Sequence, residues 1–166
     1  MMKQGMQRAQ TPSMEDYLEA IANLSGERKV VRVNQIGQTL QVTMPSVTSA
    51  LKKLSDEGLV QHEKYGYVEL TPKGEEIAKE TIRRHKILSQ FFTQALGVDQ
   101  KTAEEDACKI EHIISLASLE RLVKFLEFME ACPLGEANFP NRYGYFLEHG
   151  KLPKECLQKG SGKRSN

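Results

Sequence analysis

NQIGQTLQVTMPSVTSALKKL, residues 34–54, is the stretch that decides the fold. It holds two amphipathic segments separated by a short turn; Asn34 is placed to cap the first, and Thr43 the second, with Pro45 in the first turn. The apolar positions recur at helical spacing and are expected to face inward: Ile36, Leu40 and Val42 in the first segment, and Val47, Leu51 and Leu54 in the second. The sequence therefore predicts a helix–turn–helix.

A β-hairpin is predicted directly after this unit. Residues 59–63 and 67–70 alternate between apolar and polar side chains and are joined around Tyr65 and Gly66. The second helix is expected to end at Gly58, in front of the hairpin. A helix–turn–helix alone could be a structural three-helix unit with a solvated outer face. The hairpin in this order favours a winged helix that binds DNA.

The outer face of the second helix carries short polar and basic side chains, as a recognition helix requires. Serine and threonine can contact phosphates or base edges, and lysine supplies charge to the DNA backbone. Between Glu27 and Lys64 there are six basic residues against four acidic ones, a modest local excess in a chain of net charge +1. The residues predicted to contact DNA are Arg32, Thr43, Pro45, Ser46, Ser49, Lys52, Lys53, Lys64 and Tyr65.

Helices are predicted on both sides of this unit. The first begins at Pro12 and Ser13 and ends near Leu24, and residues 30–33 form a brief strand or an extended entry to the next helix. After the hairpin, Pro72 begins a long helix that ends near Leu96. Asp99 caps a helix that ends near Ala117, and Ser118 caps one at 119–130. No regular element is predicted after Pro133.

The chain has 166 residues, of which 39% are apolar and 27% are charged. This composition is typical of a globular protein. No apolar run approaches the roughly 20 residues that span a bilayer, and the N-terminus lacks the apolar core of a secretion signal. We therefore expect a cytoplasmic protein that does not enter the membrane. Its three widely spaced cysteines are then expected to be reduced ligands or buried thiols rather than a disulfide framework.

The segment CKIEH, residues 108–112, predicts a metal site. On a helix, Cys108, Glu111 and His112 at i, i+3 and i+4 would project from one face. A thiolate, a carboxylate and an imidazole suit a first-row transition metal such as Fe²⁺ or Mn²⁺. Because apolar Ile113 and Ile114 follow, the polar pair is expected on a core-forming helix, where burial without a partner is costly. Asp16, Glu19 and His85 are the candidates for the remaining ligands.

Several motifs in the same order resemble the diphtheria toxin repressor / manganese transport regulator family of iron- and manganese-dependent repressors. The resemblance runs from about Thr11 to Val123. It rests on TPSMEDYLE at 11–19, MPSVT at 44–48, LTPKG at 70–74, RH at 84–85 and ACKIEH at 107–112. It implies a mainly α chain, with a winged helix-turn-helix domain followed by an all-helical metal-binding and dimerisation domain. The expected organisation is a flexible N-terminus at 1–10, these two domains at 11–74 and 75–150, and a flexible tail at 151–166.

The candidate ligands differ in which branch of the family they match. Asp16 and Glu19 match ligand positions of the manganese branch, Cys108 matches the iron branch, and His85, Glu111 and His112 fit both. Glu104 stands where the iron branch has a histidine ligand of a second site, but Ser89 replaces that site's glutamate. The thiolate favours Fe²⁺ over Mn²⁺, and the two N-terminal carboxylates favour harder ions. We favour Fe²⁺. Too few residues follow Glu130 for the SH3-like third domain of the longer iron repressors.

These observations predict a homodimer that binds double-stranded operator DNA and, as the family implies, represses metal-uptake genes. The metal would act as a clamp between the DNA-binding and dimerisation domains. A metal-independent winged-helix regulator with a vestigial site is one alternative. A metal-dependent hydrolase is another, but no second catalytic carboxylate–histidine set supports it. We therefore expect a regulator and not an enzyme.

Overall fold

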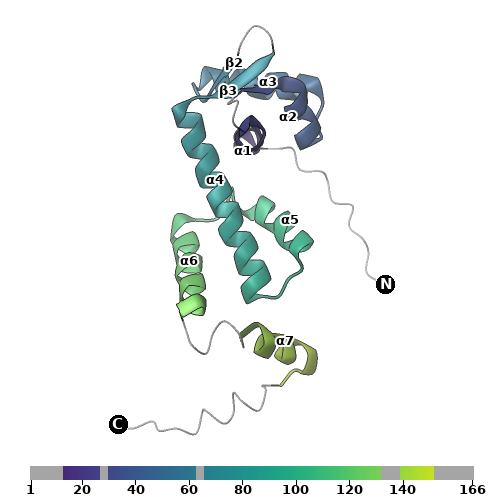
Figure 1. The fold of residues 1–166 in the computed structure, drawn as a ribbon, viewed down its shortest axis with the longest axis vertical. Coiled ribbons are helices and arrows are strands. Elements are labelled where there is room, and N and C mark those ends of the chain that lie inside the picture. Colours follow the sequence, from purple (N-terminus) through teal and green to yellow (C-terminus); the bar gives the residue numbers. More distant parts are fainter. Residues whose placement is uncertain (1–12, 27–29, 63–65, 132–138, 152–166) are drawn as a thin grey trace. The chain divides into compact units, whose positions relative to one another are not determined.

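The computed structural model describes residues 13–26, 30–62, 66–131 and 139–151. They belong to two compact units, 1–82 and 83–166, which are described separately (Figure 1). The predicted flexible N-terminus at 1–10 lies outside the described residues, as does nearly all of the predicted tail. Within the described residues, no helix is long and apolar enough to cross a membrane.

The first unit begins with helix α1 (Met14–Ser25), which starts where the sequence predicts. The backbone N–H of Asp16 donates to Ser13 Oγ at 3.1 Å, and the Asp16 carboxylate accepts from the backbone N–H of Ser13. This reciprocal capping box satisfies two backbone donors that have no partner inside the helix. Tyr17, Leu18 and Ile21 are buried on the inner face of α1.

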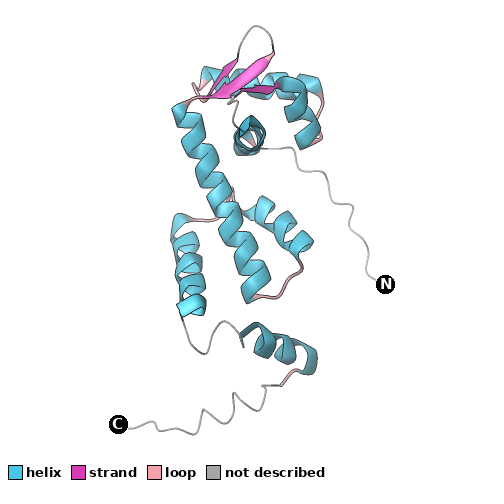
Figure 2. Cartoon of the chain, in the orientation of Figure 1, coloured by secondary structure: helices cyan, strands magenta, loops and turns pink. Residues whose placement is uncertain are grey.

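A three-stranded antiparallel sheet confirms the predicted hairpin and adds one strand to it (Figure 2). The strands are β1 (Val30–Arg32), β2 (Val60–His62) and β3 (Tyr67–Leu70), in the order β1-β3-β2. Val60 pairs with Leu70 across the hairpin, and Arg32 pairs with Tyr67 on the other edge of β3. Residues 30–32 therefore form a strand rather than only an extended entry, and Val33 already belongs to the next helix.

Helix α2 (Val33–Leu40) begins directly where β1 ends, so the predicted cap at Asn34 is wrong. The residue in front of the helix is Arg32, whose backbone N–H donates to Gln35 Oε1 at 3.0 Å. The backbone N–H of Val33 donates to the carbonyl of Gly66 at 3.1 Å. The chain thus passes from strand to helix with no intervening residue, and Asn34 is already helical.

Helix α3 (Met44–Asp56) follows α2 after a turn. Gln41 adopts the left-handed conformation, with φ 54° and ψ 41°, and Val42 lies in the turn rather than in α2. Thr43 precedes α3 as predicted, and its Oγ1 lies 3.0 Å from Ser46 Oγ rather than bonding to a backbone N–H. The three helices, the sheet and the start of the helix that follows the sheet enclose one apolar core. Its buried residues are Tyr17, Leu18, Ile21, Val31, Ile36, Val47, Ala50, Leu51, Leu54, Leu59, Val60, Val68 and Ala78.

The motif LTPKG joins the hairpin to helix α4 (Pro72–Gln90) through close backbone packing. Thr71 Oγ1 donates toward the carbonyls of Gly58 (2.8 Å) and Leu59 (3.2 Å) and accepts from the backbone N–H of Gly74 (3.1 Å). A Cβ on Gly74 would overlap the carbonyl oxygen of Leu59. The position therefore requires glycine for steric reasons, although its φ is not positive.

The second unit contains the last part of α4 and further helices, and the residues described in it form no strand (Figure 2). After Gln90 the chain continues as a π-helical turn, η2 (Phe91–Ala95), where the sequence predicts only more α-helix. Phe91 makes an edge contact with Phe125 of α6, with ring centroids 5.9 Å apart. Helix α5 (Gln100–Ile110) is capped by Asp99 as predicted.

The ends of the later helices differ from the prediction. Helix α5 ends at Ile110 rather than near Ala117, and helix α6 (Leu116–Ala131) starts earlier than predicted. Ser115, not Ser118, provides the cap, because its Oγ accepts from the backbone N–H of Ser118 at 3.2 Å. Helix α7 (Phe139–His149) forms where no regular element was predicted. The expected fold class, a mainly α chain with a winged helix followed by a helical domain, is confirmed.

Candidate metal centre and nucleic-acid interface

His85 on α4 lies between two carboxylates of the second unit. Its Nδ1 is 2.8 Å from Oε2 of Glu111, and its Nε2 is 2.5 Å from Oε2 of Glu104. Glu104 also accepts hydrogen bonds from Ser89 Oγ at 3.1 Å and from Gln100 Nε2. The structure thus brings together three of the predicted ligands, His85, Glu104 and Glu111.

The two short contacts favour an imidazolium at His85. An ionised carboxylate accepts hydrogen bonds and does not donate them, so a ring nitrogen that bonds to one carries a proton. The hydrogen bond to Glu111 is the largest cause that raises the pKa of His85 to about 9, and the bond to Glu104 adds to it against the opposing effect of burial. The hydrogen bond from His85 likewise lowers the pKa of Glu104. A metal ion bound at either ring nitrogen must therefore displace a proton.

Glu111 is the most deeply buried candidate ligand, with an exposed fraction of 0%. Its Oε1 has no hydrogen-bond partner among the described residues, although Nε2 of His112 lies 3.3 Å away. A buried carboxylate oxygen without a hydrogen bond is costly, and coordination of a cation would remove that cost. The Glu111 carboxylate is therefore well suited to bind a metal ion.

Cys108 and His112 complete the donor set of this unit. The Cys108 side chain is exposed, and its Sγ lies within 4.8 Å of a carboxylate oxygen of Glu111. The His112 side chain is 18% exposed and lies beside the same carboxylate. Sulfur, nitrogen and oxygen donors thus lie close to Glu111, and such a set suits a transition metal.

Two premises of the prediction made from CKIEH are wrong. Helix α5 ends at Ile110, so His112 lies in the turn after the helix and not on its last face. Ile113 is 79% exposed, so the following apolar pair does not indicate a core-forming helix. Just past the end of the helix, the Glu111 carbonyl accepts a hydrogen bond from Arg84 Nη1 at 3.4 Å. Sequence reasoning missed this contact, although Arg84 lies in the quoted RH motif.

Asp16 and Glu19 lie on α1, in the first unit, at an i, i+3 spacing. The Asp16 carboxylate already serves the capping box with Ser13. Both side chains are partly exposed. Their predicted part in the metal site stays a prediction.

The outer face of α3 is polar and exposed, as predicted for a recognition helix. Val47, Leu51 and Leu54 are buried on the inner face and fix the orientation of the helix. The predicted DNA-contacting residues that lie exposed on or next to α3 are Thr43, Pro45, Ser46, Ser49, Lys52 and Lys53. Arg32 is also exposed, at the end of β1. Lys64 and Tyr65 lie outside the described residues.

Family models match both halves of the chain. The model described as the iron dependent repressor N-terminal DNA binding domain matches residues 10–68, and that of the iron dependent repressor metal binding and dimerisation domain matches residues 71–140. The HTH-type transcriptional regulator MntR of Lysinibacillus sphaericus is 39% identical over 123 residues, which cover 74% of this chain and 88% of that protein. The chain belongs to the diphtheria toxin repressor / manganese transport regulator family.

Other members of the family are similarly related. The MntR protein of Bacillus subtilis is 38% identical over 120 residues, which cover 72% of this chain and 84% of that protein. Among solved structures, the manganese regulator SloR is 35% identical with a TM-score of 0.65 over 75% of this chain. A manganese-dependent transcriptional repressor solved with manganese is 27% identical, with a TM-score of 0.64 over 70% of this chain. The chain spans 58% and 53% of those two longer proteins.

Membership establishes the general class of this protein. It is a metal-dependent, DNA-binding transcriptional regulator of this family, with a DNA-binding domain followed by a metal-binding and dimerisation domain. The relatives are named as transcriptional regulators, which supports a regulator rather than an enzyme at the level of the family.

Proposed function

We propose that this protein is a homodimeric repressor of metal-uptake genes whose affinity for its operator depends on Fe²⁺ or Mn²⁺. The single observation that carries the metal dependence is Glu111: a fully buried carboxylate, one oxygen of which lacks a hydrogen bond within the described residues. Such a group is costly in a protein that never binds a cation. The names of the manganese-responsive relatives support the same reading.

The proposed ligands are Glu111, His112, Cys108 and His85 from the second unit and Asp16 and Glu19 from α1. Glu104 is proposed as an additional ligand, because it shares His85 with Glu111. When bound, the metal supplies positive charge that neutralises these carboxylates. His85 then gives up its proton, and Ser89 and Gln100 continue to orient Glu104.

We propose that ligands from both units couple metal binding to DNA binding. Arg32 and the exposed residues of α3 would contact the operator, joined by Lys64 and Tyr65. Because free energies of binding are reciprocal, a metal that favours the DNA-competent arrangement is itself bound more tightly when DNA is present. A coupling of about 1–3 kcal/mol corresponds to roughly a 5- to 150-fold change in operator affinity.

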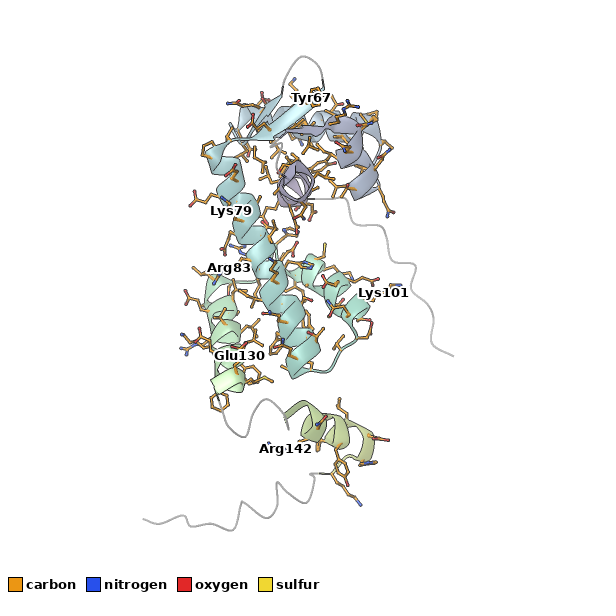
Figure 3. All side chains as sticks on the ribbon, viewed as in Figure 1. Tyr67, Lys79, Arg83, Lys101, Glu130 and Arg142 are labelled. Carbon is orange, nitrogen blue, oxygen red and sulfur yellow. The ribbon has the colours of Figure 1, made fainter. Side chains whose placement is uncertain are left out.

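Operator binding under anaerobic conditions tests this proposal. A preferred duplex would be selected from a random pool with the wild-type protein, and its affinity measured with Mn²⁺, Fe²⁺, Co²⁺, Zn²⁺ and no metal. We expect the metal to tighten binding by at least about fivefold, and the His112→Ala variant to lose this response while remaining folded. Lys101→Ala, an exposed change on α5 outside the candidate ligands, is the matched control (Figure 3).

Equal affinity with and without metal would refute the proposal. In that case the protein would be a metal-independent winged-helix regulator whose donor cluster is vestigial. The metal that gives the largest response at its cellular concentration identifies the physiological cofactor. The thiolate of Cys108 favours Fe²⁺ over Mn²⁺ in this comparison.

A further inference from the structure

Tyr67, which is labelled in Figure 3, pairs with Arg32 on the surface of the first unit. They face each other across the antiparallel strands β1 and β3. Arg32 Nη2 donates to the Tyr67 hydroxyl at 3.2 Å, and the guanidinium carbon lies 5.5 Å from the centroid of the Tyr67 ring. A hydrogen bond and a cation–π contact thus hold one side chain in a defined place.

The contact with Tyr67 does not neutralise the positive charge of Arg32, so this charge can act on an anion. The partner is a neutral hydroxyl, and no carboxylate in the described parts of the chain forms an ion pair with this guanidinium. An arginine that is held by a carboxylate has its charge neutralised, whereas one held by a phenol keeps it. The guanidinium also retains N–H donors in a fork that matches two oxygens of a phosphate.

The surface next to the pair is hollowed, and none of the described residues that line it is acidic. The hollow is lined by Arg32, Val33, Asn34, Gly66 and Tyr67. Val33 and Asn34 form the first turn of α2, where the helix dipole favours an anion. The hollow therefore lies at the start of the helix–turn–helix and beside β3 of the wing.

We infer that Arg32 binds a backbone phosphate of the DNA and that Tyr67 is a positioning residue that holds the guanidinium for this contact. The inference rests on the proposed DNA-binding function and extends it to a residue, Tyr67, that sequence reasoning did not select. Phosphate contacts fix the register and orientation of a protein on the duplex without reading its sequence. Arg32 therefore contributes to affinity for any duplex, and Tyr67 contributes only through Arg32.

Salt-dependent DNA binding tests the phosphate contact. Affinities of the full chain for the selected duplex and for a scrambled duplex would be measured in saturating Mn²⁺ over a series of salt concentrations. Each phosphate contact that is removed lowers the slope of log K against log salt by about 0.9. We expect Arg32→Ala to lower this slope by that amount per subunit and to weaken both duplexes equally, and Arg32→Lys to retain most of the slope.

A double-mutant cycle tests the role of Tyr67. We expect Tyr67→Leu to weaken binding by roughly fivefold in the wild-type background and to have no effect in the Arg32→Ala background. Tyr67→Phe keeps the ring and loses only the hydroxyl, so it should give an intermediate loss. The thermal midpoint of each variant establishes that the fold is retained, and Tyr67→Phe keeps the test informative if Tyr67→Leu unfolds.

The possible failures are distinguishable. If the wild-type protein binds neither duplex, the proposed function fails, and this inference fails with it. If the wild type binds and Arg32→Ala keeps both its affinity and its salt slope, only the phosphate contact is refuted. A loss confined to the selected duplex would show that Arg32 reads a base. Equal losses from Tyr67→Leu in both backgrounds would show that Tyr67 does not act through Arg32.

Discussion

Gln41, in the turn between α2 and α3, provides a quantitative test of the winged-helix geometry. It is the one residue other than glycine with a positive φ among the described residues, at φ 54° and ψ 41°. A side chain in this left-handed region brings Cβ close to the following carbonyl, which costs about 1–2 kcal/mol. Replacement by glycine removes that strain. The greater conformational freedom of glycine in the unfolded chain offsets about 0.4–1 kcal/mol of the resulting gain in stability.

We therefore expect Gln41→Gly to stabilise the folded protein by about 0.5–1 kcal/mol. For a chain of this size, that gain raises the thermal midpoint by about 1–4 °C. Scanning calorimetry of the metal-free full chain measures the change. The side chain is exposed, so no packing contact in the core is lost.

Two controls separate strain from other effects. Gln41→Ala keeps Cβ and its strain, so it should not raise the midpoint. Gln38→Gly, at an exposed position inside α2, should lower stability by about 0.5–1 kcal/mol, because glycine is unfavourable in a helix interior. If Gln41→Gly lowers the midpoint as much as Gln38→Gly does, the turn does not have the conformation described.

Three further predictions concern the metal centre and the packing beneath the wing. In the metal-free protein, the raised pKa of His85 stabilises the fold fully below pH 6.5, and this stabilisation is lost as pH rises through about 9. In denaturation titrations, the His85→Gln variant should not show this loss. Metal titrations should show that Cys108→Glu shifts preference from Fe²⁺ toward Mn²⁺, because a carboxylate is a harder donor than a thiolate; an unchanged ratio of affinities would exclude Cys108 as a ligand. Gly74→Ala should destabilise the first unit by more than about 3 kcal/mol, because Cβ meets the Leu59 carbonyl; retention of wild-type urea stability would contradict this packing.

The parts of the fold that could be predicted from the sequence are those that interactions between residues close in the chain determine. Ser13 and Asp99 cap their helices as expected, because a short polar side chain at a helix start has few alternative uses. The apolar spacing of Val47, Leu51 and Leu54 defined the buried face of α3. In each case the deciding interaction lies within one turn or along one face of an element.

The errors arose where a distant residue decides the local structure. α5 ends at Ile110, and the carbonyl of Glu111 just beyond it accepts from Arg84, 27 positions earlier in the chain. α2 begins at Val33, not at the better capping residue Asn34, because the sheet fixes the preceding strand. Neither contact has a signature in the local sequence.

The residues of the candidate site could be selected from their types and spacing. Their burial could not be predicted in this way. Spacing singled out Glu111 and His112, and the structure adds that Glu111 is fully buried while neighbouring Ile113 is exposed. Ser89 and Gln100, which hold Glu104, could not be selected from the sequence, because single hydroxyl and amide side chains are common on helices. Tyr67 was missed for a similar reason, since a tyrosine in a strand usually contributes to packing alone.

The central proposal is that one divalent ion takes ligands from α1 and from the second unit together. Anomalous X-ray scattering from crystals of the Mn²⁺-loaded protein, recorded at the manganese edge, tests this most directly. We predict a manganese peak coordinated by Asp16 or Glu19 and also by Glu111 and His112. A peak whose protein ligands all come from residues 83–166 would contradict the claim.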